Sequence, residues 1–175
     1  MKLLSFLLIT LLFSGCGYVP SAKFSRVVVG DSISTSVKIS IIDPENTVII
    51  KDAVDSAIIE VFHASLVPKE ISKTHLTIGL SNPSYSAIQY DSDGFIVAYR
   101  TTVSLSILRD TKDSTEKKNY TARGTYDFSV TPNAVITDQE RFDAIKFGSV
   151  KAIKSFVAQV SAEGARKKKE NSKKE

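Results

Sequence analysis

In four segments of the chain, hydrophobic side chains alternate with polar ones. The alternation is clearest in residues 97–107, where Val103 and Leu105 would face one way and Arg100 and Ser104 the other. A period of two predicts a β-strand with one buried face. The four predicted strands are 37–41, 76–90, 97–107 and 120–129. Pro83 interrupts the second, which predicts a bulge or bend there.

Two other segments have apolar residues at helical spacing. The first follows Asp43-Pro44, with Asn46 or Thr47 as its predicted cap, and ends before Pro68. The second begins with the capping box Thr137-Asp138-Gln139-Glu140 and loses its apolar stripe near Gly164. The predicted fold is α+β, a four-stranded, mostly antiparallel sheet with both helices on one face (β-α-β-β-β-α).

The first residues of the chain have the pattern of an export signal. Lys2 precedes a short apolar run that ends at Ser14-Gly15, and the single cysteine, Cys16, follows directly. This run is too short to span a membrane as a helix, which takes about 20 residues. Leu12-Phe13-Ser14-Gly15-Cys16 resembles the lipobox of bacterial lipoproteins, which makes Cys16 the predicted lipidation site. We therefore predict a signal peptide over 1–15, a tether over 16–36 and a folded domain over 37–164.

The net charge of +4 is located mainly at the end of the sequence. Of 23 basic and 19 acidic residues, Lys2 lies in the leader, and six basic and two acidic residues lie in 166–175. The remaining 16 basic and 17 acidic residues give a nearly neutral domain, without the basic face expected of a protein that binds nucleic acid. Residues 165–175 lack apolar side chains after Ala165, so we predict a disordered basic tail.

The sequence offers no catalytic centre and no metal site. His63 and His75 lack the spacing of metal ligands, and Asp91-Ser92-Asp93-Gly94 is better explained by a hairpin turn than by a calcium loop. Ser114-Thr115-Glu116-Lys117 matches Ser-x-x-Lys, but it falls in a polar loop and not at a helix start. We therefore predict a binding or assembly protein with no cofactor, and not an enzyme.

One candidate contact surface lies on the predicted outward face of the sheet. Lys38, Arg100 and Arg123 interrupt a run of Ser and Thr there. A solvated face is one explanation, because antiparallel sheets commonly have one. The other is a surface that binds a partner, with cations that meet phosphate or carboxylate groups. The pattern alone does not separate the two.

Several pieces of the chain, taken in order, resemble the LPS-assembly lipoprotein LptE family. They are the lipobox with Cys16-Gly17-Tyr18, the order of elements, the stretches 98–107 and 121–128, and Pro132-Asn133-Ala134 followed by Asp138-Gln139-Glu140. The resemblance covers nearly the whole domain, although the basic tail and the short turn at 91–94 depart from the enteric pattern. Asp43-Pro44-Glu45-Asn46 is similar to the version in epsilon-class proteobacteria.

This resemblance implies a non-enzymatic protein of the outer membrane. Gly17, where inner-membrane lipoproteins of enteric bacteria have Asp, implies outer-membrane delivery. Such a protein plugs an LptD-like barrel, helps it assemble and contacts lipopolysaccharide, and Arg100, Arg123 and Lys38 would supply cations for that contact. The alternative is a periplasmic accessory lipoprotein of a cell-wall synthase or of a lipid-transport ABC system, which shares an export leader and a small α+β domain.

Overall fold

The computed structural model describes residues 28–39, 44–62, 66–112, 114 and 117–171. Its main elements are five strands and two helices, so the predicted α+β class is confirmed. In chain order they are β1 (Ile33–Ile39), α3 (Pro44–Phe62), β2 (Thr74–Leu80), β3 (Ser84–Tyr90), β4 (Ile96–Thr111), β5 (Lys118–Ser129) and α4 (Asp138–Asn171).

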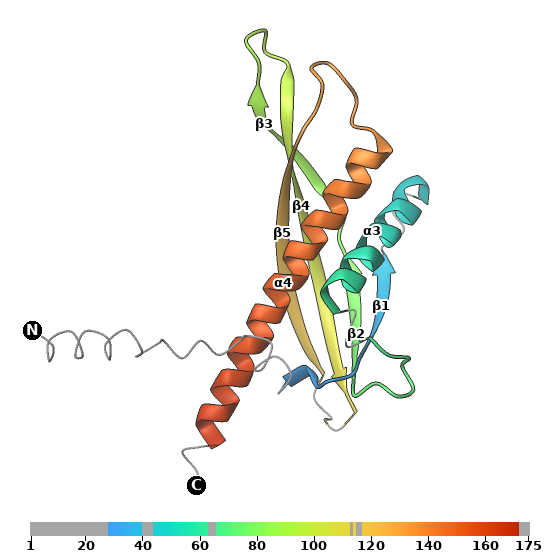
Figure 1. Cartoon of the computed structure of the whole chain (residues 1–175), viewed down its shortest axis with the longest axis vertical. Helices are drawn as coiled ribbons and strands as arrows, with labels where there is room; N and C mark the ends of the chain where they lie inside the picture. The colour runs from blue at the N-terminus through green and yellow to red at the C-terminus, as the bar shows by residue number, and fades with distance from the viewer. Residues whose placement is uncertain (1–27, 40–43, 63–65, 113, 115–116, 172–175) are drawn as a thin grey trace, which may run out of the picture.

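The sheet is organised around β4, its longest strand. β5 pairs antiparallel with one edge of β4 along almost its whole length. β2 and β3 both pair antiparallel with the other edge, β2 with the half that ends at Thr111 and β3 with the half that begins at Ile96. β1 pairs parallel with β2, so the sheet is four strands wide at the lower end of Figure 1 and narrows toward the upper end.

The predicted second strand is two strands in the structure. β2 ends at Leu80 and β3 begins at Ser84, and the two follow one another along the same edge of β4. Pro83 lies in the gap, where its missing N–H removes no ladder hydrogen bond. The predicted interruption is therefore confirmed, whereas the predicted count of four strands is wrong because the interruption separates two paired segments.

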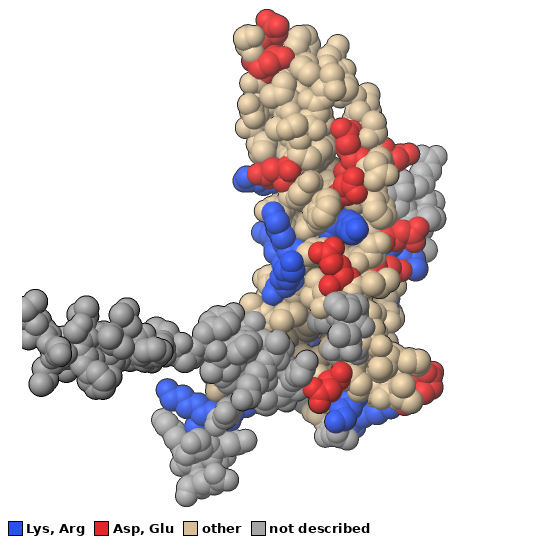
Figure 2. Space-filling model, viewed as in Figure 1, with Lys and Arg blue, Asp and Glu red and all other residues tan. Residues whose placement is uncertain are grey.

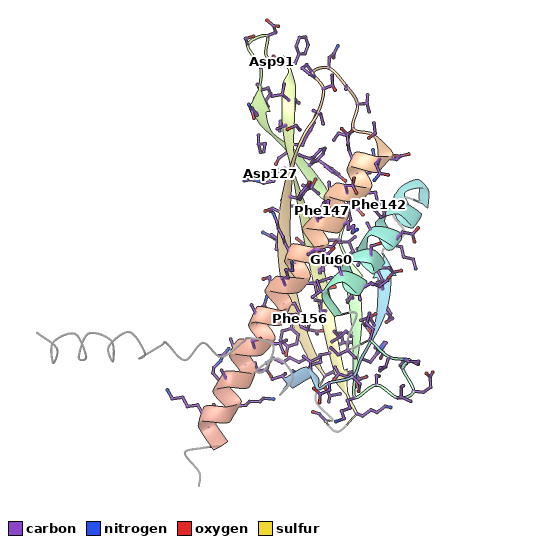
Figure 3. The ribbon with its side chains drawn as sticks, viewed as in Figure 1. Glu60, Asp91, Asp127, Phe142, Phe147 and Phe156 are labelled. Carbon is purple, nitrogen blue, oxygen red and sulfur yellow. The ribbon has the colours of Figure 1, made fainter. Side chains whose placement is uncertain are left out.

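Both helices cover one face of the sheet and enclose a single core. On β4, Val103, Leu105 and Ile107 are buried, as the alternation predicted. The other core residues include Val54, Ala57 and Ile58 of α3, Leu76, Ile78 and Leu80 of β2, and Ile145, Ile153, Phe156 and Val160 of α4. Phe156 of α4 is 1% exposed and packs edge-on against Tyr120 of β5 (Figure 3).

Helix α4 and strand β5 approach closely at two glycines. A Cβ atom placed on Gly124 would lie 2.1 Å from the carbonyl oxygen of Gly148 and 2.5 Å from the backbone nitrogen of Ala152. A Cβ on Gly148 would come closest to the Val103 side chain, at 2.8 Å from Cγ2, and would lie 3.8 Å from the nearest backbone atom, the Gly124 oxygen. The absence of a side chain at Gly124 therefore sets how closely the helix packs on the sheet.

The folded domain begins before Val37, so the predicted tether over 16–36 is too long. β1 starts at Ile33, and Val28 and Val29 are helical and buried in the core. The tether prediction would leave both valines outside the core, and Val27 lies outside the described residues. Ser34 and Ser36 point to the side of the sheet without helices, where polar side chains are tolerated. The tether was predicted because serines are frequent in this segment of the sequence.

The helix boundaries differ from the prediction at two places. α3 begins at Pro44, so the predicted cap at Asn46 or Thr47 is wrong; proline suits a first helical turn, where no N–H partner exists. α4 begins at Asp138, and its capping box is confirmed: the Thr137 N–H and hydroxyl donate to Glu140 Oε2, each at 2.8 Å. These hydrogen bonds lower the pKa of the Glu140 carboxyl.

α4 also continues beyond the predicted end at Gly164. It runs to Asn171, so the predicted disorder of 165–175 is wrong for 165–171, and 172–175 lie outside the described residues. Alanine, arginine and lysine favour helix, and extending an existing helix needs no new nucleation. An ion pair from Lys167 to Glu163, one turn earlier, supports the extension.

Candidate functional site

The side of the sheet without α3 and α4 is lined by hydroxyl groups, and we call it the hydroxyl face. Cross-strand pairs such as Ser36 with Thr77 and Thr102 with Thr125 place hydroxyls side by side. Its Ser and Thr residues are Ser34, Ser36, Thr77, Ser84, Ser86, Thr102, Ser104, Ser106, Thr121, Thr125 and Ser129. The predicted outward orientation of this run is confirmed.

Arg100 lies on the hydroxyl face as predicted, but it is paired with a carboxylate. It stands directly opposite Asp127 of β5, and its Nε and Nη2 donate to the two carboxylate oxygens at 2.7 Å each. These hydrogen bonds lower the pKa of Asp127 and raise that of Arg100. The two charges cancel, so Arg100 presents no free positive charge to a partner (Asp127 is labelled in Figure 3).

Lys38 and Arg123 remain as the exposed cations of this face. Arg123 donates to the Ser104 hydroxyl at 3.3 Å, and among the described residues no carboxylate lies within ion-pair distance of either side chain. Lys38 of β1 pairs with Gly79 of β2, which in turn pairs with Ser106 of β4. Three strand spacings separate the two cations, a distance of about 15 Å. Hydroxyls between them complete a surface suited to phosphate or sugar groups.

His75 links β1 and β2 at the lower edge of the hydroxyl face. Ser72 Oγ donates to the Lys69 carbonyl at 2.9 Å and therefore accepts from Ser34 Oγ, 2.8 Å away. Ser34 Oγ in turn accepts from His75 Nδ1 at 2.8 Å, which leaves Nε2 to accept from Ser36 Oγ at 3.1 Å. Burial and the nearby charge of Lys69 lower the pKa of His75. The imidazole is therefore a neutral link within the sheet.

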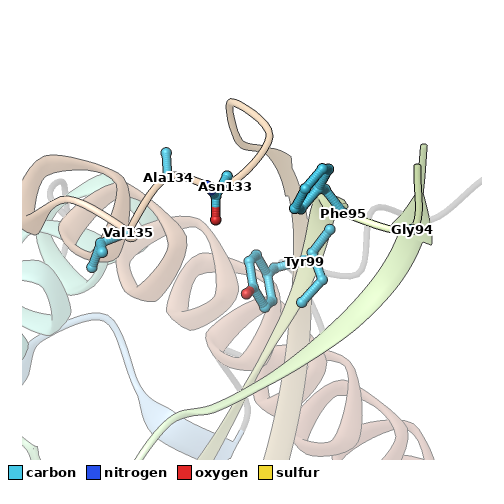
Figure 4. Close-up of a pocket in the computed structure, with 7 residues that line it drawn as sticks. Gly94, Phe95, Tyr99, Asn133, Ala134 and Val135 are labelled. Atoms are coloured by element: carbon cyan, nitrogen blue, oxygen red, sulfur yellow. The ribbon is translucent and has the colours of Figure 1, made fainter. Parts of the chain in front are cut away.

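Exposed apolar side chains gather at the upper end of the molecule, which we call the apolar tip. Val135 is 86% exposed, Tyr90 58% and Phe95 44%. A pocket of about 370 Å³ separates the β3–β4 hairpin from the loop after β5, with Phe95 and Tyr99 on one side and Asn133 to Val135 on the other (Figure 4).

The hairpin at the apolar tip is held by the predicted turn at 91–94. Asp91 Oδ1 accepts from the backbone N–H of Asp93 at 3.0 Å and of Phe95 at 2.8 Å. Gly94 has φ +84°, which suits glycine. The Asp91 carboxylate thus closes the turn with its own backbone, and the prediction of a hairpin in place of a calcium loop is confirmed.

A buried ion cluster around Glu163 was not predicted from the sequence. The carboxylate accepts from Lys118 Nζ at 2.8 Å and from the Tyr120 hydroxyl at 2.7 Å, and Arg109 Nη1 lies 3.6 Å away. Burial disfavours the charged carboxylate, but hydrogen bonds and the cations outweigh this and lower its pKa to about 2. Arg109 lies on the core side of β4, two residues after the buried Ile107. Its even spacing from Ile107 along the strand was the sequence signal that could have predicted its burial.

The described part of the chain contains neither a side-chain group that could hold a metal ion nor a helix that could span a membrane. There, no three His, Cys, Asp or Glu side chains come together in a way that could hold a metal ion. No helix within the described ranges is long and apolar enough to cross a membrane. Cys16 and His63 lie outside those ranges, so the lipidation of Cys16 stays a prediction.

Comparisons with known proteins give similarity in structure alone. No protein-family model and no curated protein matches the chain. Rare lipoprotein B from Shewanella oneidensis is 9% identical with a TM-score of 0.41, over 79% of this chain and 96% of that one. A minor lipoprotein from Acinetobacter baumannii is 8% identical (TM-score 0.42, 76% and 92%). Uncharacterized lipoprotein B from Nitrosomonas europaea is 15% identical (TM-score 0.38, 87% and 92%). Such values do not fix the function of this chain.

Proposed function

We propose that this protein is an outer-membrane lipoprotein that assembles with an LptD-like barrel, plugs it, and assists the insertion of lipopolysaccharide. The observation that carries the proposal is the hydroxyl face, which has two exposed cations and, in the described structure, no helix packed over it. The export-signal pattern that ends at Cys16 and the sequence resemblance to the LptE family support an LptD-like barrel as the proposed partner.

The charge pattern of the hydroxyl face suits a phosphorylated glycolipid. Lys38 and Arg123 can each meet a phosphate, and the hydroxyls between them can donate to sugar oxygens. Arg100 contributes differently, because its pairing with Asp127 keeps that part of the face neutral. The pair of cations and not the predicted set of three is therefore the proposed contact for anionic groups.

The apolar tip supports a second contact, with the barrel itself. Contiguous exposed apolar residues are typical of protein interaction surfaces. Tyr90, Phe95 and Val135 lie together at one end of an elongated molecule, where they can enter a lumen without the sheet having to bend. The hydroxyl face would then lie along the barrel wall.

Reversing both free cations of the hydroxyl face should weaken the proposed associations. We expect Lys38→Glu/Arg123→Glu to reduce co-purification with the barrel, or lipopolysaccharide binding in vitro, by at least about tenfold, because two attractive contacts become repulsive. Both side chains are exposed, so the midpoint of thermal unfolding should stay within a few degrees of the unmodified protein.

The matched control reverses two cations on the helix-covered side. Lys146→Glu/Lys154→Glu changes the net charge equally but leaves the hydroxyl face untouched. We expect it to keep both associations. If the Lys38/Arg123 variant keeps its fold and both associations, or if the control loses them equally, the hydroxyl face is a solvated surface and the proposed contact is wrong.

The predicted lipidation of Cys16 can be tested independently of the fold. Cys16→Ala should accumulate as a precursor that retains residues 1–15 and takes up no labelled palmitate, because the acylated thiol is lost. Mass spectrometry and radiolabelling of the membrane fraction measure this. Unchanged mass and labelling in the variant would show that Cys16 is not the lipidation site.

A further inference from the structure

The two ends of this elongated molecule differ in charge. We call the end formed by residues 28–32, 66–73, 109–112, 114, 117–118 and 161–171 the basic end, and these residues include ten basic and five acidic ones. The opposite end, residues 91–95 and 130–143, holds one basic and five acidic residues. On the face shown in Figure 2, Lys and Arg are absent from the upper end, where Asp and Glu occur.

At the basic end, cations outnumber the carboxylates that face them. Glu163 alone lies within ion-pair distance of three cations: Arg109, Lys118 and Lys167. Among the described residues, its single negative charge leaves two positive charges of this cluster uncompensated. Lys118 and Lys167 are half exposed, so their excess charge is presented to solvent.

A small pocket at the same end is also lined by more basic than acidic side chains. It has a volume of about 130 Å³ and is lined by Lys69, Ser72, Lys73, His75, Asp110 and Lys112. Asp110 already pairs with Lys117 at 2.9 Å, so its charge is compensated from outside the pocket. Three lysines therefore face a space without a free carboxylate among the described residues, a setting suited to a phosphate group.

The position of the basic end relates it to the predicted anchor. The described chain begins there, at Val28, and α4 ends there, with Arg166, Lys167 and Lys169 exposed (Figure 1). In the sequence, Cys16 precedes Val28 by twelve residues.

We propose that the basic end is a membrane-contact surface that binds the headgroups of anionic phospholipids. Each cation close to an anionic leaflet adds attraction that fades within about one Debye length, some 8–10 Å. The acidic far end is repelled by the same surface. On a leaflet without the barrel, the molecule therefore stands with its long axis away from the surface and its apolar tip pointing into the solvent.

The binding test uses the chain from Gly17 to Glu175, which contains the whole described hydrophobic core, Val28 to Val160, and no lipidation site. Sedimentation with phosphatidylglycerol-containing vesicles should show binding that is lost in pure phosphatidylcholine and weakens as salt rises. Lys69→Gln/Arg166→Gln/Lys169→Gln should lower the affinity by about 100-fold. Lys146→Gln/Lys151→Gln/Lys154→Gln removes the same charge from the middle of α4 and should change it by less than about threefold.

Orientation provides a second readout. With no other cysteine in this chain, a fluorophore on Ser114→Cys reports the basic end and one on Ser92→Cys reports the apolar tip. Quenching by spin-labelled headgroups should affect the first label and spare the second. Equal loss of binding in the two triple variants, or quenching of the Ser92 label, would overturn the proposal. Neither outcome bears on the hydroxyl face, whose test is barrel co-purification.

Discussion

Gly124→Ala should lower the free energy of unfolding by about 3 kcal/mol, at the upper end of what an overpacked core methyl causes. The added Cβ would lie 2.1 Å from the Gly148 carbonyl oxygen and 2.5 Å from the Ala152 nitrogen. Both are backbone atoms of α4, so no side-chain rotation relieves the clash and the helix has to move off the sheet. Urea unfolding near neutral pH measures the change.

Gly148→Ala is the matched control for this prediction. The same methyl group there meets Val103 Cγ2, the end of a side chain, at 2.8 Å. Alanine also favours helix over glycine by about 1 kcal/mol, which offsets part of the crowding. We expect a net change below about 1 kcal/mol. Equal effects at the two positions would contradict the helix–sheet spacing described here.

Glu163→Gln should destabilise the protein by about 3 kcal/mol at pH 6. The substitution keeps the shape of the side chain but removes the only carboxylate, among the described residues, within ion-pair distance of Arg109. The side chain of Arg109 is 7% exposed. Removing one partner leaves a buried charge without compensation, which is more damaging than replacing a whole pair. Denaturant unfolding of the variant and the unmodified protein gives this difference.

Lowering the pH should remove most of the difference in the free energy of unfolding between the Glu163→Gln variant and the unmodified protein. The pKa of Glu163 is about 2 in the folded protein against a usual value of 4.5, so folding favours the charged form. Its contribution is complete above about pH 4.5 and is lost as the pH falls toward 2. The gap between the two proteins should shrink from about 3 kcal/mol at pH 6 to below about 1 kcal/mol at pH 2.5. A gap that does not change with pH would show that the carboxylate charge is not what stabilises the cluster.

Local patterns in the sequence predicted most of the sheet. Alternation along 97–107 and 120–129 identified the buried faces of β4 and β5, because the side-chain period of a strand is fixed by its backbone. The capping box at Thr137 and the turn at Asp91 were predictable for a similar reason: each is closed by hydrogen bonds between residues two to four apart.

The same local patterns did not predict ion pairs between residues far apart in the sequence. The ion pair between Arg100 and Asp127 depends on the register of β4 against β5, which the loop between them sets. The contact of Glu163 with Lys118 requires α4 to cross β5 at a particular height. Alternation shows which face a residue occupies but not which residue stands opposite it.

We propose that this chain works as the partner of an outer-membrane barrel. Affinity purification of the full chain from solubilised membranes, followed by mass spectrometry of the recovered proteins, tests it most directly. We expect a large outer-membrane β-barrel of the lipopolysaccharide translocon as the main partner, with recovery that falls in the Lys38→Glu/Arg123→Glu variant. Recovery of a cell-wall synthase or of a lipid-transport ABC system in its place, with no such barrel, would contradict the proposed partnership.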